Sequence, residues 1–260
     1  MGEHVNTILL LHGWGSRAAS WGRVKELLES NGYTVLVPDL PGFGDNPMPQ
    51  EAWNVDNYVD WVNNFIDHAG AKRAYIMGHS FGGRIAIKMA VNYPEKIAGL
   101  ILVSAAGIKP RKTIWHIVIY AIVKIVKAVF RFLFRFPLIK WFIEHVIDKK
   151  NELHFQELFY HIIVRRRDYI ETKGIMRETF KKVIDEDLSR IIDKIIIPTH
   201  IVWGDKDKMT PVKDAYLLNE KVKLSSLTVL KGFGHALNFE TPDLVAEEII
   251  TFLHHRKACL

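Results

Sequence analysis

Short, wholly apolar runs alternate with amphipathic stretches on either side of a long central segment. The apolar runs predict strands over residues 8–11, 34–37, 74–77, 100–103, 200–203 and 227–230. The amphipathic stretches predict helices over 17–30, 55–69, 84–92, 211–219 and 242–254, the last two with Thr210 and Thr241 as N-caps. Strands that are apolar throughout are buried on both faces. The pattern therefore predicts an α/β fold, with a mostly parallel sheet of about six strands and helices on both faces.

The central segment, residues 109–190, lacks the strand-turn-helix rhythm and reads as helical almost throughout. We expect a helical insertion here, between core segments 1–108 and 191–260. Residues 114–136 are dense in Ile, Val and Phe, and their cations share one helical face: Lys124, Lys127, Arg131 and Arg135. Cations inside the stretch argue against a membrane span. An interfacial helix and a helix packed on the core with its basic stripe in water both stay open.

The net charge of +6 is unevenly distributed. Residues 109–182 hold 17 Lys and Arg against 7 Asp and Glu, so the rest of the chain is mildly acidic. A uniformly basic nucleic-acid binder does not fit this distribution, and we expect no nucleic-acid partner. The run Arg165-Arg166-Arg167 could steer anionic groups or simply be solvated.

The single cysteine and the first residues of the chain indicate where in the cell the protein is expected. The single cysteine, Cys259, excludes an intrachain disulfide and stands too near the end for a prenylation signal. The first residues lack the basic-then-apolar order of a signal peptide, so the expected location is the cytoplasm.

The segment Gly78-His79-Ser80-Phe81-Gly82-Gly83 carries the strongest chemical signal, because it follows a predicted strand and precedes a helix. A sharp turn there lifts the Ser80 hydroxyl above the sheet edge, and the flanking glycines let the backbones pass closely. The backbone N–H of Phe81, at the helix N-terminus, is then placed to stabilise an oxyanion.

A nucleophilic serine needs a base, and the base needs an acid. His235 lies in a glycine-flanked loop after the last predicted strand, while most other histidines lie in the central segment or end the last helix. The loop after the preceding strand offers two carboxylates, of which Asp207 is the predicted acid and Asp205 the predicted turn former. The rival position after strand 100–103 holds no acid.

The order Ser80, Asp207, His235 resembles the α/β-hydrolase family over most of residues 5–107 and 195–255. The resemblance implies that His12-Gly13-Trp14-Gly15 is the oxyanion loop, with Trp14 supplying the second N–H. Two further segments match family loops: Asp39-Leu40-Pro41-Gly42-Phe43-Gly44, and Gly234-His235 followed by Glu240-Thr241-Pro242. Within the family, the sequence most resembles the small carboxylesterases and lipid hydrolases, including the pimeloyl-ester esterase type. Only a few residues precede the first strand, so we expect six strands where the fuller family pattern has eight.

The resemblance also implies a function. Residues 109–190 would form a cap, or lid, over the active site and bind the substrate. We expect a serine hydrolase of carboxylic esters with an apolar acyl or aromatic part, needing no cofactor and no metal. The alternatives are a catalytically silent or membrane-surface ligand-binding protein, a C–C bond hydrolase, and an acyltransferase. Lipid contact through the cap stays open, and so does the oligomeric state.

Overall fold

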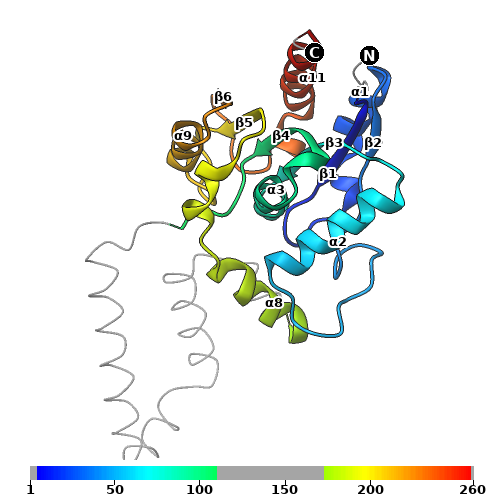
Figure 1. The fold of residues 1–260 in the computed structure, drawn as a ribbon. Helices are drawn as coiled ribbons and strands as arrows, with labels where there is room; N and C mark the ends of the chain where they lie inside the picture. Colours follow the sequence, from blue (N-terminus) through cyan, green and yellow to red (C-terminus); the bar gives the residue numbers. More distant parts are fainter. Residues whose placement is uncertain (1–4, 110–172, 259–260) are drawn as a thin grey trace, which may run out of the picture. The chain divides into compact units, whose positions relative to one another are not determined.

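The computed structural model describes residues 5–109 and 173–258, and within them six strands form one parallel sheet in the order β2-β1-β3-β4-β5-β6 (Figure 1). The strands are β1 (Thr7–Leu11), β2 (Thr34–Leu36), β3 (Ala74–His79), β4 (Ile97–Val103), β5 (Thr199–Gly204) and β6 (Ser225–Leu230). Every neighbouring pair runs parallel. The predicted α/β fold with a sheet of about six strands is confirmed.

Helices connect the strands. The α-helices of the described residues are α1 (Gly22–Ser30), α2 (Val55–His68), α3 (Phe81–Asn92), α8 (Gly174–Asp185), α9 (Val212–Lys221), α10 (Leu237–Glu240) and α11 (Pro242–Ala258). The short 3-10 helices are η1 (Ala18–Trp21), η2 (Pro94–Lys96), η3 (Leu188–Arg190) and η4 (Ile192–Lys194). The helix expected over 17–30 therefore begins as a 3-10 turn, and the one expected from residue 84 begins earlier, at Phe81.

One predicted cap is wrong. Helix α9 begins at Val212 with Pro211 as its N-cap, so Thr210 does not cap it. The hydroxyl of Thr210 instead donates to the carboxylate of Asp207. The Thr210 side chain thus forms a hydrogen bond within its own loop instead of capping the helix as the capping pattern predicted.

Alternating side chains of each strand enter two hydrophobic cores, one on each face of the sheet. In β1, Leu9 and Leu11 enter the core that α2, α3 and α9 cover, while Ile8 and Leu10 enter the core under α1 and α11. All four side chains are fully buried, and each such burial stabilises the fold by about 1.5–3 kcal/mol. This two-sided burial explains why the strands read as continuous apolar runs.

The parallel arrangement decides where chemistry can occur. The carboxyl ends of parallel strands lie along one edge of the sheet, and the crevice beside that edge is the usual place for a ligand. Residues 12–17 follow β1, Ser80 follows β3, and residues 205–211 follow β5. The loop that carries His235 follows β6. The sheet therefore gathers all the predicted catalytic segments at one edge.

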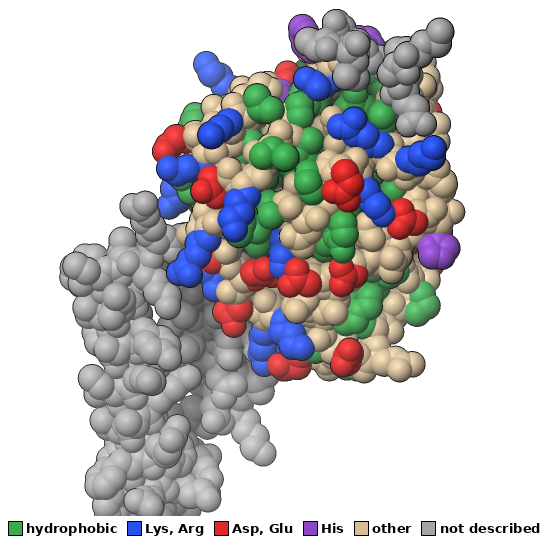
Figure 2. All heavy atoms as spheres, viewed as in Figure 1, with side chains coloured by type: hydrophobic (Ala, Val, Ile, Leu, Met, Phe, Trp, Pro, Cys, Tyr) green, Lys and Arg blue, Asp and Glu red, His purple; other side chains and the backbone are tan. Residues whose placement is uncertain are grey.

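Most of the predicted cap, residues 110–172, lies outside the described residues, including the basic apolar stretch 114–136 and Arg165–Arg167. The described part of that prediction contains α8 and η3, whose side chains Val183 and Leu188 belong to the same core as α3. None of the helices that the structure describes is both long and apolar enough to cross a membrane. Lys and Arg side chains intermingle with Asp and Glu on the face seen in Figure 2. That face carries no patch of a single sign.

Candidate active site

Ser80 occupies a strained turn between β3 and α3. Its backbone has φ 51° and ψ −111°, a conformation that L-residues rarely adopt. A Cβ at position 78 would lie 2.3 Å from the Gly82 carbonyl oxygen, and one at position 82 would lie 2.2 Å from that of Leu11. Only glycine fits at either position, so the two glycines flanking Ser80 are required by the turn itself.

Hydrogen bonds on both sides hold this turn in place. The Ser80 N–H donates to the Val103 carbonyl at 3.2 Å. The Ser80 carbonyl accepts from the N–H groups of Ala106 at 2.9 Å and Arg84 at 3.2 Å. Strain of about 1–3 kcal/mol persists only when the surroundings over-determine the backbone, and these bonds do so.

His235 and Asp207 are joined directly, as the sequence predicts. His235 Nδ1 lies 2.7 Å from Asp207 Oδ2, and the Asp207 side chain is fully buried. Because a carboxylate only accepts, Nδ1 carries the hydrogen in a neutral imidazole, which leaves Nε2 free to accept a proton. The pair thus has the tautomer that a general base requires.

Further donors surround Asp207. Its Oδ1 accepts from the N–H groups of Met209 and Thr210, both at 2.8 Å. Its Oδ2 accepts from the Thr210 hydroxyl at 2.8 Å. Burial raises the pKa of Asp207, but the bond and charge of His235 and the bonds from Thr210 outweigh it and hold that pKa below its usual range. The acid is therefore ionised when His235 becomes protonated.

His79, the residue before Ser80, contacts His235. The rings of His79 and His235 lie 4.9 Å apart, and His79 Nε2 is 2.9 Å from the His235 carbonyl oxygen. Burial lowers the pKa of His79 to about 4, with the nearby His235 adding to the effect. A neutral His79 donates to that carbonyl, so the residue before Ser80 anchors the backbone of His235.

The predicted oxyanion loop lies against the same turn. A Cβ at position 13 would lie 3.5 Å from the Ser80 Cβ, so Gly13 passes close to the nucleophile. The rings of Trp14 and Phe81 meet edge to face at 5.2 Å. Phe81 is the first residue of α3, where backbone N–H groups have no partner within the helix. The two predicted N–H donors, those of Trp14 and Phe81, thus belong to segments that pack on each other beside Ser80.

His12 holds the oxyanion loop in place through two hydrogen bonds. Its Nε2 accepts the Leu40 N–H at 2.9 Å, so its Nδ1 must donate to the Gly13 carbonyl at 2.8 Å. Burial lowers the pKa of His12 and keeps the ring neutral, which this bonding requires. The ring thereby ties the loop after β1 to the 39–44 loop.

An aromatic wall stands beside the oxyanion loop. The ring of Trp14 lies 4.9 Å from that of Phe43 and 4.9 Å from that of Phe180 on α8. Phe81 completes the group, and its ring also meets Tyr58 at 4.9 Å. Such a wall suits an apolar substrate group next to a polar reaction centre.

Asp205 has a different role from Asp207. Its Oδ1 accepts the Gly232 N–H at 2.7 Å, which joins the loop after β5 to the loop after β6. The sequence predicts that Asp205 shapes its own turn, whereas in the structure its carboxylate joins two separate loops.

A second serine, histidine and acid are also bonded together. His200 Nδ1 lies 2.8 Å from Ser226 Oγ, and His200 Nε2 lies 3.0 Å from Glu248 Oε2. Ser226 stands within β6, however, with no strained turn and no helix N-terminus beside it. This group joins α11 to the sheet, whereas Ser80 lies in a strained turn at the N-terminus of α3. Ser226 is thus a matched reference for Ser80.

Sequence reasoning missed several residues of the site: His12, His79, Thr210 and Asp214. Burial raises the pKa of Asp214, on α9, to about 6, and the charge of Asp207 adds to the effect. The histidines stand inside recognised motifs, yet their hydrogen bonds reach loops far along the chain. No metal site emerges from residues 5–109 and 173–258, where no three His, Cys, Asp or Glu side chains come together suitably.

Known proteins resemble this chain across most of its length. A family model described as alpha/beta hydrolase fold matches residues 6–242. Human monoacylglycerol lipase ABHD6 is 26% identical over 263 residues, which cover 96% of this chain and 76% of that protein. Lipase 3 of a Moraxella species is 25% identical over 236 residues, covering 88% and 71%. The structure of a hydrolase from Pseudomonas aeruginosa has a TM-score of 0.68 at 20% identity, covering 97% of this chain and 91% of that one. The sequence relatives support hydrolase activity, and the structural likeness supports the fold.

Proposed function

Because the chain belongs to the alpha/beta hydrolase fold family, we propose that it is a serine hydrolase acting on carboxylic esters with an apolar acyl or aromatic part. One observation carries the proposal: the 2.7 Å contact between His235 Nδ1 and Asp207 Oδ2, in a loop that His79 ties to the nucleophile turn. This contact leaves His235 Nε2 free, and in the proposal that atom accepts the proton of the Ser80 hydroxyl.

Acylation begins with the attack of Ser80 on the ester carbonyl. His235 Nε2 takes the hydroxyl proton while Oγ forms a bond to the carbonyl carbon. The resulting oxyanion accepts hydrogen bonds from the backbone N–H groups of Trp14 and Phe81. Loss of one such donor typically lowers the rate by about 10²–10³.

The ionised Asp207 stabilises the imidazolium of His235 that forms in this step. The imidazolium then gives its proton to the departing alcohol oxygen, and the acyl group stays on Ser80. In the second half-reaction a water molecule attacks the acyl carbon while His235 Nε2 takes its proton. The acid leaves, and the proton returns from His235 to Ser80 Oγ.

The aromatic wall supports the apolar part of the substrate. Trp14 and Phe43 are partly exposed beside the proposed oxyanion donors, and the buried Phe180 packs on Trp14. An acyl chain or aromatic ring placed there loses water without leaving a polar group unpaired. The names of the lipase relatives agree with an ester of this kind.

Hydrolysis of p-nitrophenyl butyrate by the full chain tests the proposal. We expect Ser80→Ala to lower kcat by at least about 10³-fold while circular dichroism and the melting temperature stay unchanged. Ser226→Ala is the matched control, because Ser226 also bonds a histidine yet lies outside the proposed site. Equal activity of Ser80→Ala and the unmutated chain contradicts the proposal, as does a matching loss in Ser226→Ala.

Product analysis separates hydrolysis from acyl transfer. In mixtures of water and a simple alcohol, the proposal predicts free acid as the main product. A dominant new ester would instead indicate that the acyl group passes to the alcohol.

A further inference from the structure

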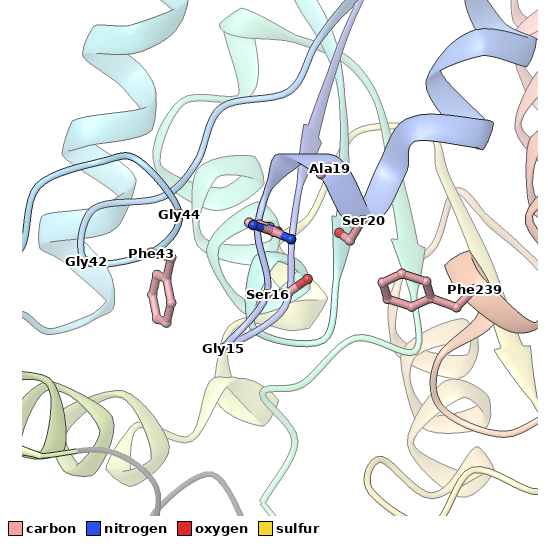
Figure 3. A pocket seen from close by; sticks show the side chains of 9 residues that line it. Gly15, Ser16, Ala19, Ser20, Gly42, Phe43, Gly44 and Phe239 are labelled. Atoms are coloured by element: carbon pink, nitrogen blue, oxygen red, sulfur yellow. The ribbon is translucent and has the colours of Figure 1, made fainter.

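A hollow lies next to the oxyanion loop, and most of its lining has no role in the proposed chemistry. Its volume is about 630 Å³, and it is lined by residues 15–17, 19, 20 and 42–44 together with Phe239 of α10. Figure 3 shows Phe43 and Phe239 on opposite sides, with Ser16 and Ser20 between them. Because Gly15 directly follows Trp14, and Phe43 packs on the Trp14 ring, this hollow opens beside the proposed oxyanion donors.

Ser20 gives the hollow a buried hydroxyl. Only 9% of Ser20 is exposed, and its Oγ has no hydrogen-bond partner in the part of the chain that the structure describes. Its backbone carbonyl accepts from Asn238 Nδ2 at 3.1 Å, which fixes η1 against α10. The Asn238 Oδ1 likewise has no partner among the described residues. A buried polar atom without a partner is unfavourable, so a ligand that accepts a hydrogen bond from the Ser20 hydroxyl would bind more tightly.

Arg17 gives the same hollow a positive charge. Its side chain is exposed, lines the hollow and makes no ion pair within residues 5–109 and 173–258. Arg17 interacts electrostatically with Asp39, whose oxygens already accept from the N–H groups of Ala18 and Asp45. The planar guanidinium therefore keeps its fork of donors for a carboxylate or a phosphate.

We infer that this hollow binds an anionic group, a carboxylate or a phosphate monoester, carried by one end of the ester substrate. The Arg17 guanidinium pairs with the anion, and the hydroxyls of Ser16 and Ser20 donate to its oxygens. Phe43 and Phe239 flank the chain that links the anion to the scissile ester. The inference rests on the proposed function, since it assigns a substrate class to the same site.

Matched anionic and neutral esters test it. Two pairs carry the anionic group on the alcohol part of the ester. Carboxymethyl hexanoate is compared with the neutral carbamoylmethyl hexanoate, and 2-phosphoethyl hexanoate with the neutral 2-methoxyethyl hexanoate. Monoethyl adipate is compared with ethyl adipamate, which places it on the acyl part. The two alcohol-side pairs distinguish a carboxylate from a phosphate, and the third pair shows which end of the ester enters the hollow.

The measured quantity is the ratio of kcat/KM for the anionic ester to that for its neutral counterpart, at low ionic strength. For at least one pair we expect Arg17→Gln to lower this ratio about tenfold, mainly through KM, because a charged hydrogen bond is lost. Ser20→Ala should lower the same ratio by about fivefold. Arg190→Gln is the matched control, because it removes the same charge from an exposed arginine that does not line the hollow.

An unchanged ratio for all three pairs in Arg17→Gln overturns the inference, and so does an equal fall in Arg190→Gln. Hydrolysis of p-nitrophenyl butyrate in the same preparations reports separately on the proposed function. If no ester is hydrolysed, that function fails and binding decides the inference. Calorimetric titration of adipate and of inorganic phosphate should then show binding that weakens about tenfold in Arg17→Gln. Equal binding, or none by the unmutated chain, overturns it.

Discussion

The buried imidazole of His79 donates a hydrogen bond from Nε2 to the backbone carbonyl of His235, with 2.9 Å between the two atoms. Because His79 directly precedes Ser80, this bond links the backbone of His235, the proposed base, to the turn that carries Ser80, the proposed nucleophile. A reactive geometry is sensitive to displacements of about 1 Å, so a single bond at this point affects rate more than stability.

Replacement of His79 tests that positioning role. We expect His79→Phe to lower kcat for p-nitrophenyl butyrate about tenfold with little change in KM, since the ring volume is kept and the donor is lost. His79→Asn, which retains an N–H donor, should recover part of the loss. A kcat for His79→Phe equal to that of the unmutated chain would show that only packing matters at this position.

The hydroxyl of Thr210 stabilises the ionised Asp207, to which it donates at 2.8 Å. Thr210→Val removes this donor at nearly constant volume, so the pKa of Asp207 should rise and kcat should fall by about fivefold to tenfold. The acid side of the pH profile of kcat should move to higher pH. Steady-state kinetics over a range of pH measures both effects.

Thr228→Val provides the control for this substitution. The Thr228 hydroxyl also donates to a carboxylate, that of Glu248 at 2.7 Å, but in the group that joins α11 to the sheet. Its loss should leave the pH profile of kcat unchanged. A shift of equal size in both variants contradicts a specific role for Thr210.

The steric requirement for glycine around Ser80 predicts how substitutions there change stability. A Cβ at position 78 meets backbone atoms of Gly82 and Gly83 within 2.5 Å, so Gly78→Ala should lower the free energy of unfolding by about 3 kcal/mol or more. At Gly22, at the start of α1, nothing lies within 4 Å of such an atom and φ is helical. Gly22→Ala should therefore stabilise the fold by up to about 1 kcal/mol. Urea denaturation measures both, and similar effects at the two positions would contradict the steric account.

The buried Asp214 predicts a dependence of stability on pH. Its pKa is raised by burial from 3.8 to about 6, so between these values the unfolded chain has already lost a proton that the folded chain keeps. Stability therefore falls as pH rises through this window. Asp214→Asn removes this dependence. The free energy of unfolding of the variant, relative to that of the unmutated chain, should therefore be about 2–3 kcal/mol higher at pH 7 than at pH 4. Urea denaturation at the two pH values checks this, and a constant difference between the chains contradicts it.

The sequence predicted those parts of the site that depend on local geometry. Gly78 and Gly82 mark the turn at Ser80 because a backbone clash acts within a few residues. Loops after successive parallel strands had to meet at one edge, which brought Asp207 and His235 into the same prediction.

The remaining residues of the site depend on distant contacts. His79 meets the backbone of a residue 156 positions away, and His12 meets Leu40, 28 positions away. Neither partner can be read from a local pattern. At Thr210 a local capping pattern was present and was misleading. Its hydroxyl donates instead to the buried carboxylate of Asp207, which also bonds His235.

The most direct test of the account is to trap the acyl-enzyme. The full chain is mixed with p-nitrophenyl butyrate, quenched in acid during turnover, digested and analysed by mass spectrometry. The account predicts a butyryl group on the peptide that contains Ser80 and none on the peptide that contains Ser226. Turnover without any acyl group on Ser80, or with the acyl group on Ser226, would contradict it.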